Sequence, residues 1–286
     1  MIKIIESPRE AMQGIVPFIE TTTKVEYINA LLKAGFDSVE VGSLVSARAV
    51  PQMSDTLQVL DGIRFTGTSS KKMLLVVNTK GASTASEISF VDTISYPFSI
   101  SQRFSQLNMN STSERQLETV SEISEICTRS GKSFVVYISM AFGNPYEDEW
   151  NLEILVKWVE KLKNRGIQTI PLSNVAIRID KTLISEVFTT LIPLFPEIEF
   201  GLHLHTSEDD WYEKVEAAYT CGCRRFDSVM LGMGGCPMTG KELLGNLATE
   251  NLVRFLKNKN EIPESFNESA MIEASRQASV IFQNTL

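Results

Sequence analysis

Short apolar runs rich in β-branched and aromatic residues alternate with longer amphipathic stretches along the whole chain. A continuous run such as "SFVVYISM" suits a parallel strand that is buried on both faces. Eight runs with the length and composition of strands occur, at 2–7, 38–43, 73–78, 93–98, 133–140, 168–174, 199–205 and 226–232. The pattern therefore predicts eight strands.

The stretches between these runs have the period of amphipathic helices. In "TTKVEYINALLKAG" the residues Val25, Ile28 and Leu31 fall on one stripe, and Gly35 follows as a stop signal. The stretches "NLEILVKWVEKLKNRG" and "DDWYEKVEAAYTCG" likewise end at a glycine. Helices are therefore expected between the strands.

Eight strand–helix units predict an α/β protein with a closed (β/α)8 barrel, the TIM barrel. An open doubly wound sheet is the alternative, but eight units in so short a chain favour closure. No Pro/Gly linker divides the sequence, so we expect a single domain over residues 1–286, with the barrel at about 1–259. An additional C-terminal helix is predicted at about 264–284, packed across the barrel or against another subunit.

Composition narrows the class of protein. The chain has 286 residues, 43% of them hydrophobic, and a net charge of −8 without a Lys/Arg cluster, which disfavours nucleic acid and anionic membranes as partners. No apolar run approaches the roughly 20 residues of a membrane span. "MIKIIESPRE" reads as a strand and not as a signal peptide. The four cysteines lack the spacing of a zinc or redox motif, so we expect a cytoplasmic protein without disulfides.

Both histidines of the chain lie in one short stretch, "GLHLHTS", at positions 203 and 205. Residues i and i+2 of a strand point to the same face, so the two imidazoles would converge. His203 and His205 could be neighbours by chance, but imidazole is the commonest metal ligand. Because barrel chemistry lies at the carboxyl ends of the strands, the fold would aim this pair at the mouth.

Other polar residues follow the ends of the predicted strands, where the barrel would gather them. They are Arg9, Glu10 and Gln13 after the first strand, Glu40 and Ser43 in and at the end of the second, Asn174 after the sixth, and Cys236 and Asn246 after the eighth. Two imidazoles, a carboxylate and an amide oxygen make a plausible ligand set for a divalent cation.

Each of these residues also has an ordinary structural explanation. Arg9 and Glu10 could be an exposed ion pair, and Cys236 could be a small packing residue in a glycine-rich loop. Asn246 could simply begin a helix. Glu40 is more telling, because a buried carboxylate needs a partner and Arg9 on the adjacent strand is the natural one. The stretch "GCPMTGK" has phosphate-loop spacing, but Glu242 follows it where Ser or Thr is needed, which argues against an ATPase.

Six collinear stretches resemble a known family: "SPREAMQ", "SVEVGSLVSARAVPQMSD", "FSISQRFSQLNMNST", "YISMAFGNPYED", "GLHLHTS" and "GMGGCPMTGKELLGNLATE". They are similar to the landmarks of 3-hydroxy-3-methylglutaryl-CoA lyase, a member of the metal-dependent barrel lyases and Claisen-type synthases. The resemblance implies retro-Claisen cleavage of 3-hydroxy-3-methylglutaryl-CoA to acetyl-CoA and acetoacetate, a step of leucine catabolism. It also implies Mg²⁺ or Mn²⁺ as cofactor, with Zn²⁺ possible.

The resemblance assigns roles to individual residues. The metal ligands would be Glu10, His203, His205 and Asn246. The catalytic residues would be Arg9, which neutralises the enolate-like thioester oxygen, together with Glu40, His203 and Cys236, whose thiol would sit on a closing loop. Residues expected at the substrate are Gln13, Ser43, Ser99, Ser101 and Asn174.

Three positions depart from the usual pattern of that family. Glu10 stands where Asp is usual, Asn174 stands where the sixth strand usually ends in Asp, and Thr206 replaces the Asp after the second histidine. Asparagine cannot transfer a proton at neutral pH, and losing an essential carboxylate base costs roughly 10²–10⁴ in rate. The sequence therefore predicts an intact metal site with altered proton transfer.

These departures keep two alternatives open. The chain could act on another 3-hydroxyacyl-CoA, as a lyase or in the Claisen condensation direction, or it could be a catalytically weakened homologue that binds metal and acyl-CoA. In each case the expected partner is a small-molecule acyl-CoA. We also expect a homo-oligomer, a dimer or larger.

Overall fold

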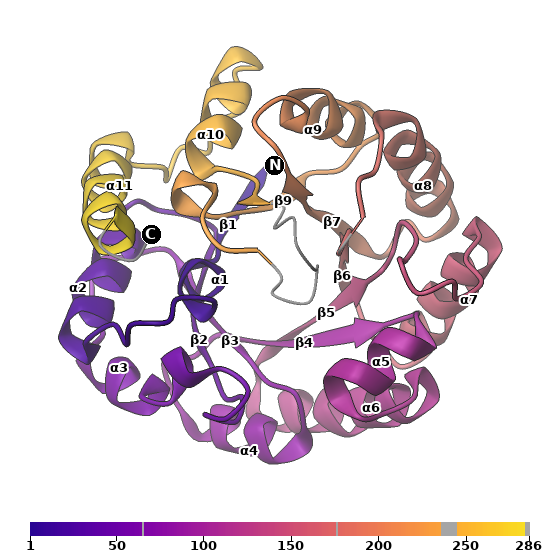
Figure 1. Ribbon diagram of the computed structural model, residues 1–286, viewed down its shortest axis with the longest axis horizontal. Coiled ribbons are helices and arrows are strands. Elements are labelled where there is room, and N and C mark those ends of the chain that lie inside the picture. Colours follow the sequence, from indigo (N-terminus) through magenta and orange to yellow (C-terminus); the bar gives the residue numbers. More distant parts are fainter. Residues whose placement is uncertain (65, 176, 236–244, 284–286) are drawn as a thin grey trace.

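The computed structural model describes residues 1–64, 66–175, 177–235 and 245–283. Eight parallel strands close into a barrel in the order β1-β2-β3-β4-β5-β6-β7-β9, which confirms the predicted (β/α)8 architecture and excludes the open sheet. The barrel strands are β1 Lys3–Glu6, β2 Ser38–Ser43, β3 Lys71–Leu75, β4 Thr93–Ser99, β5 Ser133–Ser139, β6 Thr169–Ser173, β7 Glu199–His203 and β9 Arg225–Ser228. Figure 1 looks into this barrel, with the helices arranged around it.

Helices surround the strands, and two short strands form a second sheet that is not part of the barrel ladder. The α-helices are α1 Pro8–Gln13, α2 Thr21–Leu32, α3 Thr56–Gly62, α4 Thr79–Glu87, α5 Gln102–Met109, α6 Ser113–Ser130, α7 Leu152–Lys163, α8 Lys181–Leu194, α9 Trp211–Thr220, α10 Thr249–Asn258 and α11 Glu268–Gln283. Two 3₁₀ turns, η1 Pro51–Met53 and η2 Met230–Gly232, and the strands β8 His205–Thr206 and β10 Gly245–Asn246 complete the described elements. Strands β8 and β10 pair antiparallel.

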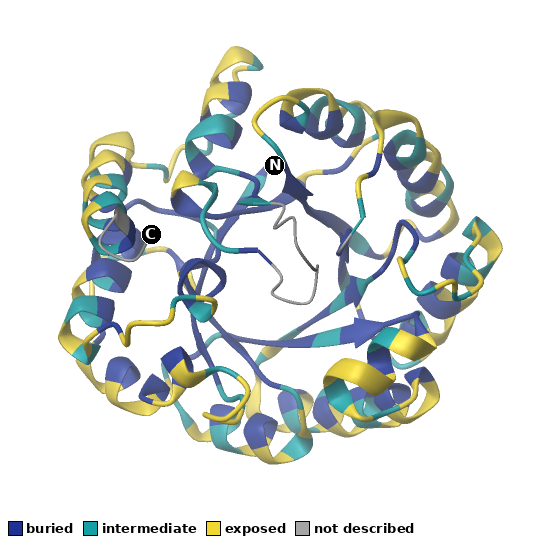
Figure 2. Cartoon of the chain, viewed as in Figure 1, coloured by how far each residue is buried: buried dark blue, intermediate teal, exposed yellow. Residues whose placement is uncertain are grey.

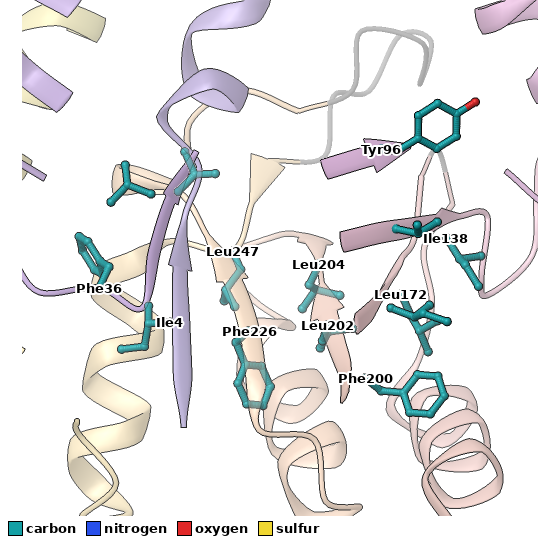
Figure 3. Packing of buried hydrophobic residues seen from close by; sticks show 14 of the residues in the cluster. Ile4, Phe36, Tyr96, Ile138, Leu172, Phe200, Leu202, Leu204, Phe226 and Leu247 are labelled. Carbon is teal, nitrogen blue, oxygen red and sulfur yellow. The ribbon is translucent and has the colours of Figure 1, made fainter. Parts of the chain in front are cut away.

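The core forms where the outer faces of the strands meet the inner faces of the helices. Figure 2 shows buried strands and helices whose outward faces are exposed. Leu202, Phe226 and Leu172 are among the fully buried residues between the two layers (Figure 3). Burial on both faces explains why the strands read as near-continuous apolar runs. In the part of the chain that the structure describes, no helix is long and apolar enough to cross a membrane.

Several strand boundaries differ from the predicted ones for local reasons. The third strand ends at Leu75 and not at 78, because the side chain of Asn78 caps α4 by accepting a hydrogen bond from the Gly81 amide. The eighth barrel strand ends at Ser228, and the chain then turns through η2, where Leu231 has a φ of 61°. The predicted strand 199–205 also stops early, at His203.

The predicted C-terminal helix is present as α11, four residues shorter at its start than expected. It packs against α2 (Figure 1). The rings of Phe282 and Tyr27 meet edge to face between the two helices, with centroids 5.9 Å apart. The helix thus covers α2 on the outside of the barrel. The single-domain organisation stays a prediction.

Candidate metal and substrate site

Helix α1 lies at the opening of the barrel (Figure 1). It carries the first group of polar residues, Arg9, Glu10 and Gln13. It begins at Pro8, directly after β1, and proline suits the first position of a helix because its missing N–H would have no helical partner there. Arg9 and Gln13 are four residues apart and therefore lie on one face of the helix. The Arg9 Nη1 donates to Gln13 Oε1 at 2.7 Å.

The two histidines do not share one strand. His203 ends β7, and His205 opens β8, where its partner in the antiparallel ladder is Asn246 of β10. The rings still converge, with centroids 5.2 Å apart and planes inclined at 71°. The expected convergence of the imidazoles is present, although the two histidines lie on different strands and His205 pairs with β10.

A carboxylate and the two imidazoles form a compact, buried cluster. Each of Glu10, His203 and His205 offers a ligand atom, and these atoms all lie within 4.8 Å of one another. Asn246 lies beside His205, and its Nδ2 donates to the Met233 carbonyl at 2.8 Å, which turns the amide in a defined direction. Within the described residues, the buried Asn246 Oδ1 and His205 Nδ1 have no hydrogen-bond partner.

These donors fit a divalent cation. Unpaired buried polar atoms are costly unless something satisfies them, and a cation would accept a lone pair from each. One carboxylate oxygen, two imidazole nitrogens and an amide oxygen are also a mixed set that Mg²⁺, Mn²⁺ or Zn²⁺ can use. The geometry therefore supports the ligand set predicted from the sequence.

The pKa values of Glu10 and His205 favour the forms that bind a metal ion. Burial alone would raise the pKa of Glu10, but the positive charge of Arg9 and of the two imidazoles lowers it to about 2. Burial and the neighbouring His203 lower the pKa of His205 to about 4. An ionised carboxylate and a neutral imidazole are the forms that bind a metal ion.

Arg9 connects the cluster to Glu40. Its Nη2 lies 2.7 Å from Glu10 Oε1, and its Nε donates to Glu40 Oε2 at 3.0 Å, so the pairing with Glu40 expected from the sequence is present. Burial raises the pKa of Glu40 to about 7, although Arg9 offsets part of that effect. A carboxyl that titrates near neutral pH is suited to proton transfer.

Asp227 is a site residue that the sequence reasoning missed. Its Oδ2 lies 3.1 Å from His203 Nδ1, and the carboxylate is buried. A carboxylate at this position favours the imidazole tautomer that carries its proton on Nδ1, which leaves Nε2 for an ion. The sequence does contain a sign of this residue, because Asp227, like Glu40, is a carboxylate inside a predicted apolar strand.

The predicted substrate-contacting serines have different surroundings. Ser101 is the N-cap of α5, where its Oγ accepts from the Phe104 amide at 3.1 Å and donates to Asp148 Oδ2 at 2.5 Å. Ser99 Oγ accepts from the Ser101 amide at 3.1 Å, so this pair shapes the turn after β4. Ser43 ends β2 with its Oγ buried and without a partner among the described residues. Contact with substrate stays a prediction for all three.

The remaining predicted residues complete the picture. Gln13 Nε2 donates to Glu10 Oε2 at 3.2 Å and so supports the candidate ligand directly. Both polar atoms of the Asn174 side chain form hydrogen bonds with the backbone of His205. Cys236 lies outside the described residues. The structure thus brings together Arg9, Glu10, Gln13, Glu40, His203, His205 and Asn246.

A closed (β/α)8 barrel with a buried carboxylate and two histidines at the carboxyl ends of its strands has the architecture of a barrel enzyme. Comparison with known proteins agrees. The model of the HMGL-like family matches residues 2–277, and the chain belongs to that family. Its named relatives are lyases, which makes this protein an enzyme of the same broad class.

Two curated relatives and one solved structure illustrate the similarity. (R)-citramalyl-CoA lyase of Chloroflexus aurantiacus is 29% identical over 278 residues, covering 94% of this chain and 87% of that protein. The mitochondrial hydroxymethylglutaryl-CoA lyase of Mus musculus is 29% identical over 280 residues, with 96% and 83% covered. A structure of an HMG-CoA lyase from Acinetobacter baumannii in complex with coenzyme A and 3-methylmalate has a TM-score of 0.89 at 28% identity, covering 99% of this chain and 92% of that one.

Proposed function

We propose that the protein catalyses divalent-metal-dependent retro-Claisen cleavage of 3-hydroxy-3-methylglutaryl-CoA to acetyl-CoA and acetoacetate. The proposal rests on the cluster of Glu10, His203 and His205, whose ligand atoms lie within 4.8 Å of one another at the strand ends. The unpartnered Asn246 Oδ1 supports it as a fourth ligand. The names of the relatives support an acyl-CoA substrate.

The reaction moves one proton and breaks one C–C bond. The tertiary hydroxyl loses its proton, its oxygen becomes the ketone of acetoacetate, and the bonding electrons move to the thioester enolate. That enolate carbon then takes up a proton to give acetyl-CoA. When bound, a divalent cation supplies Lewis-acid polarisation of the substrate oxygens.

The side chains of this protein would supply the rest of the chemistry. Arg9 is held in place by Glu10, Glu40 and Gln13, so its guanidinium is fixed before substrate arrives. A fixed cation beside the thioester oxygen stabilises the enolate charge as it forms. Glu40, whose pKa burial raises to about 7, is suited to accept the hydroxyl proton. In this proposal Cys236 returns a proton to carbon.

Purified protein with Mg²⁺ or Mn²⁺ should release acetoacetate from 3-hydroxy-3-methylglutaryl-CoA. Arg9→Met should lower kcat by at least about 100-fold, because it removes the oxyanion-stabilising cation. Arg9→Lys keeps the positive charge but not the planar guanidinium, so its kcat should lie between those of wild type and Arg9→Met. Arg115→Met, at an exposed position of α6, is the matched control and should keep full activity. Circular dichroism of each variant separates loss of fold from loss of chemistry.

A second substrate class has support of its own. The citramalyl-CoA lyase relative is as similar as the hydroxymethylglutaryl-CoA lyase one, at 29% identity each. A panel of 3-hydroxyacyl-CoA thioesters, with cleavage followed by chromatography of the CoA products, distinguishes the two. A clear preference for citramalyl-CoA would replace the leading proposal. No cleavage of any thioester with Mg²⁺, Mn²⁺ or Zn²⁺ would refute lyase activity altogether.

A further inference from the structure

The side chain of Asn174 extends the hydrogen bonding of the barrel sheet beyond the point where the backbone ladder of β6 and β7 ends. Strands β6 and β7 pair as far as Ser173 and His203, and Asn174 follows directly. Its Oδ1 accepts a hydrogen bond from the His205 amide at 2.8 Å, and its Nδ2 donates to the His205 carbonyl, also at 2.8 Å. A carboxamide carries the same donor and acceptor as a peptide group, so it replaces one rung of the ladder.

The direction of this amide is fixed by its partners. A backbone N–H can only donate and a carbonyl can only accept, so the Oδ1 and Nδ2 of Asn174 cannot be exchanged. Nδ2 also donates to the Ile177 carbonyl at 3.2 Å. With an exposed fraction of 0%, the side chain has these partners in place of water. Asn174 therefore meets the hydrogen-bonding needs of both backbone groups of His205.

His205 is held from two sides as a result. Asn174 fixes its backbone from the β6 side, and the β8–β10 ladder sets Asn246 opposite it. We propose that Asn174 is a positioning residue that fixes the His205 imidazole in the metal cluster and takes no part in proton transfer. This inference rests on the proposed metal-dependent function. Asparagine at this position supplies both the acceptor and the donor that the backbone of His205 requires.

Aspartate at position 174 would disturb this arrangement. Its carboxylate could still accept from the His205 amide, but it has no hydrogen for the His205 carbonyl. Two oxygens would then face each other where Nδ2 and the carbonyl oxygen now lie 2.8 Å apart. Asn174→Asp should therefore weaken metal binding and should not raise catalytic activity.

Mn²⁺ binding to the metal-free full-length protein tests the inference without relying on turnover. The free-ion signal in electron paramagnetic resonance gives the Kd for wild type, Asn174→Asp, Asn174→Ala and the control Asn151→Ala. Asn151 caps α7 by accepting from the Ile154 amide at 2.9 Å, so its loss tests a comparable structural role away from the cluster. Both Asn174 variants should raise Kd about 10–100-fold, the usual effect of losing a supporting contact, while Asn151→Ala leaves it unchanged.

A double-mutant cycle separates positioning from a general loss of stability. If Asn174 acts through His205, adding Asn174→Asp to His205→Ala should not change the Kd further. An additional 10-fold loss in that background would overturn the inference, as would an unchanged Kd in both single variants. A wild-type chain that binds no Mn²⁺ would instead refute the proposed metal site.

Hydrogen exchange of the His205 amide in metal-free protein tests the same contact independently of any ion. Exchange should accelerate in Asn174→Ala, which has no acceptor, and should stay slow in Asn174→Asp, which keeps one. Equal exchange in wild type and Asn174→Ala would overturn the inference even if the metal site is present.

Discussion

Gly201, the first residue of "GLHLH", leaves room for an arginine inside the barrel. It pairs with Arg225 across β7 and β9, and a Cβ added at Gly201 would lie 2.9 Å from Arg225 Cδ and 3.0 Å from its Cγ. Carbon atoms normally approach only to about 3.5–4.0 Å. Arg225 cannot easily retreat, because it is buried and its Nη1 donates to Glu199 Oε1 at 3.3 Å.

Gly201→Ala should therefore destabilise the protein. Overpacking costs about 1–3 kcal/mol, and the lower entropy of an unfolded alanine chain returns about 0.4–1 kcal/mol. A net loss of about 1–2 kcal/mol follows. With an unfolding entropy of about 0.6 kcal/mol per kelvin for 286 residues, Tm should fall by about 2–3 °C.

The same substitution should reach the metal cluster. Arg225 Nε lies 4.0 Å from Asp227 Oδ1, and Asp227 in turn holds His203, so a displaced arginine disturbs the support of a candidate ligand. Thermal unfolding followed by circular dichroism measures the first effect and Mn²⁺ titration the second. The control is Gly14→Ala, where an added Cβ meets nothing within 4 Å among the described residues. A Gly201→Ala variant as stable as Gly14→Ala would refute the reasoning.

Two further predictions concern buried carboxyls. Asp227→Asn should weaken Mn²⁺ binding about 10–100-fold, or about 1.4–2.7 kcal/mol, because a neutral amide supports the His203 imidazole less well; an unchanged Kd by calorimetry would contradict this role. Burial raises the pKa of Glu6 from 4.5 to about 8, against the smaller opposing effect of hydrogen bonds from Thr249 and Met230. Between those pH values the folded chain keeps a proton that the unfolded chain releases. The stability that this proton contributes is complete below about pH 4.5 and is lost as the pH rises to about 8. The loss is at most about 5 kcal/mol. Glu6→Gln should flatten this dependence, and urea unfolding at pH 5 and pH 8.5 would measure it. If the free energy of unfolding changes equally between these pH values in wild type and Glu6→Gln, the prediction is contradicted.

The barrel could be predicted because its strands leave a strong local signal. Strands buried on both faces read as apolar runs, and each helix carries its own stripe and stop residue, so eight units are visible in the sequence. The residues at the strand ends followed from the fold, since a parallel barrel gathers them at one end. Arg9 and Glu40 could even be paired, because a buried carboxylate demands a partner.

The details around His205 could not be read in this way. Strands β8 and β10 have two residues each, which is too short for any periodic pattern. The Asn174 side chain contacts backbone atoms 31 positions further along the chain. A backbone group is present at every residue, so the sequence does not reveal which position the side chain contacts. His203 and His205 were expected on one strand face, whereas the change of strand between them depends on the pairing with Asn246.

The central claim is that Glu10, His203 and His205 hold one divalent ion. Diffraction from crystals grown with Mn²⁺, with data collected at the manganese edge, tests it most directly. One anomalous peak per chain should lie within about 2.0–2.3 Å of one atom from each of the three side chains. A peak elsewhere, or no peak at saturating Mn²⁺ while these side chains keep their places, would contradict the metal site and the lyase chemistry built on it.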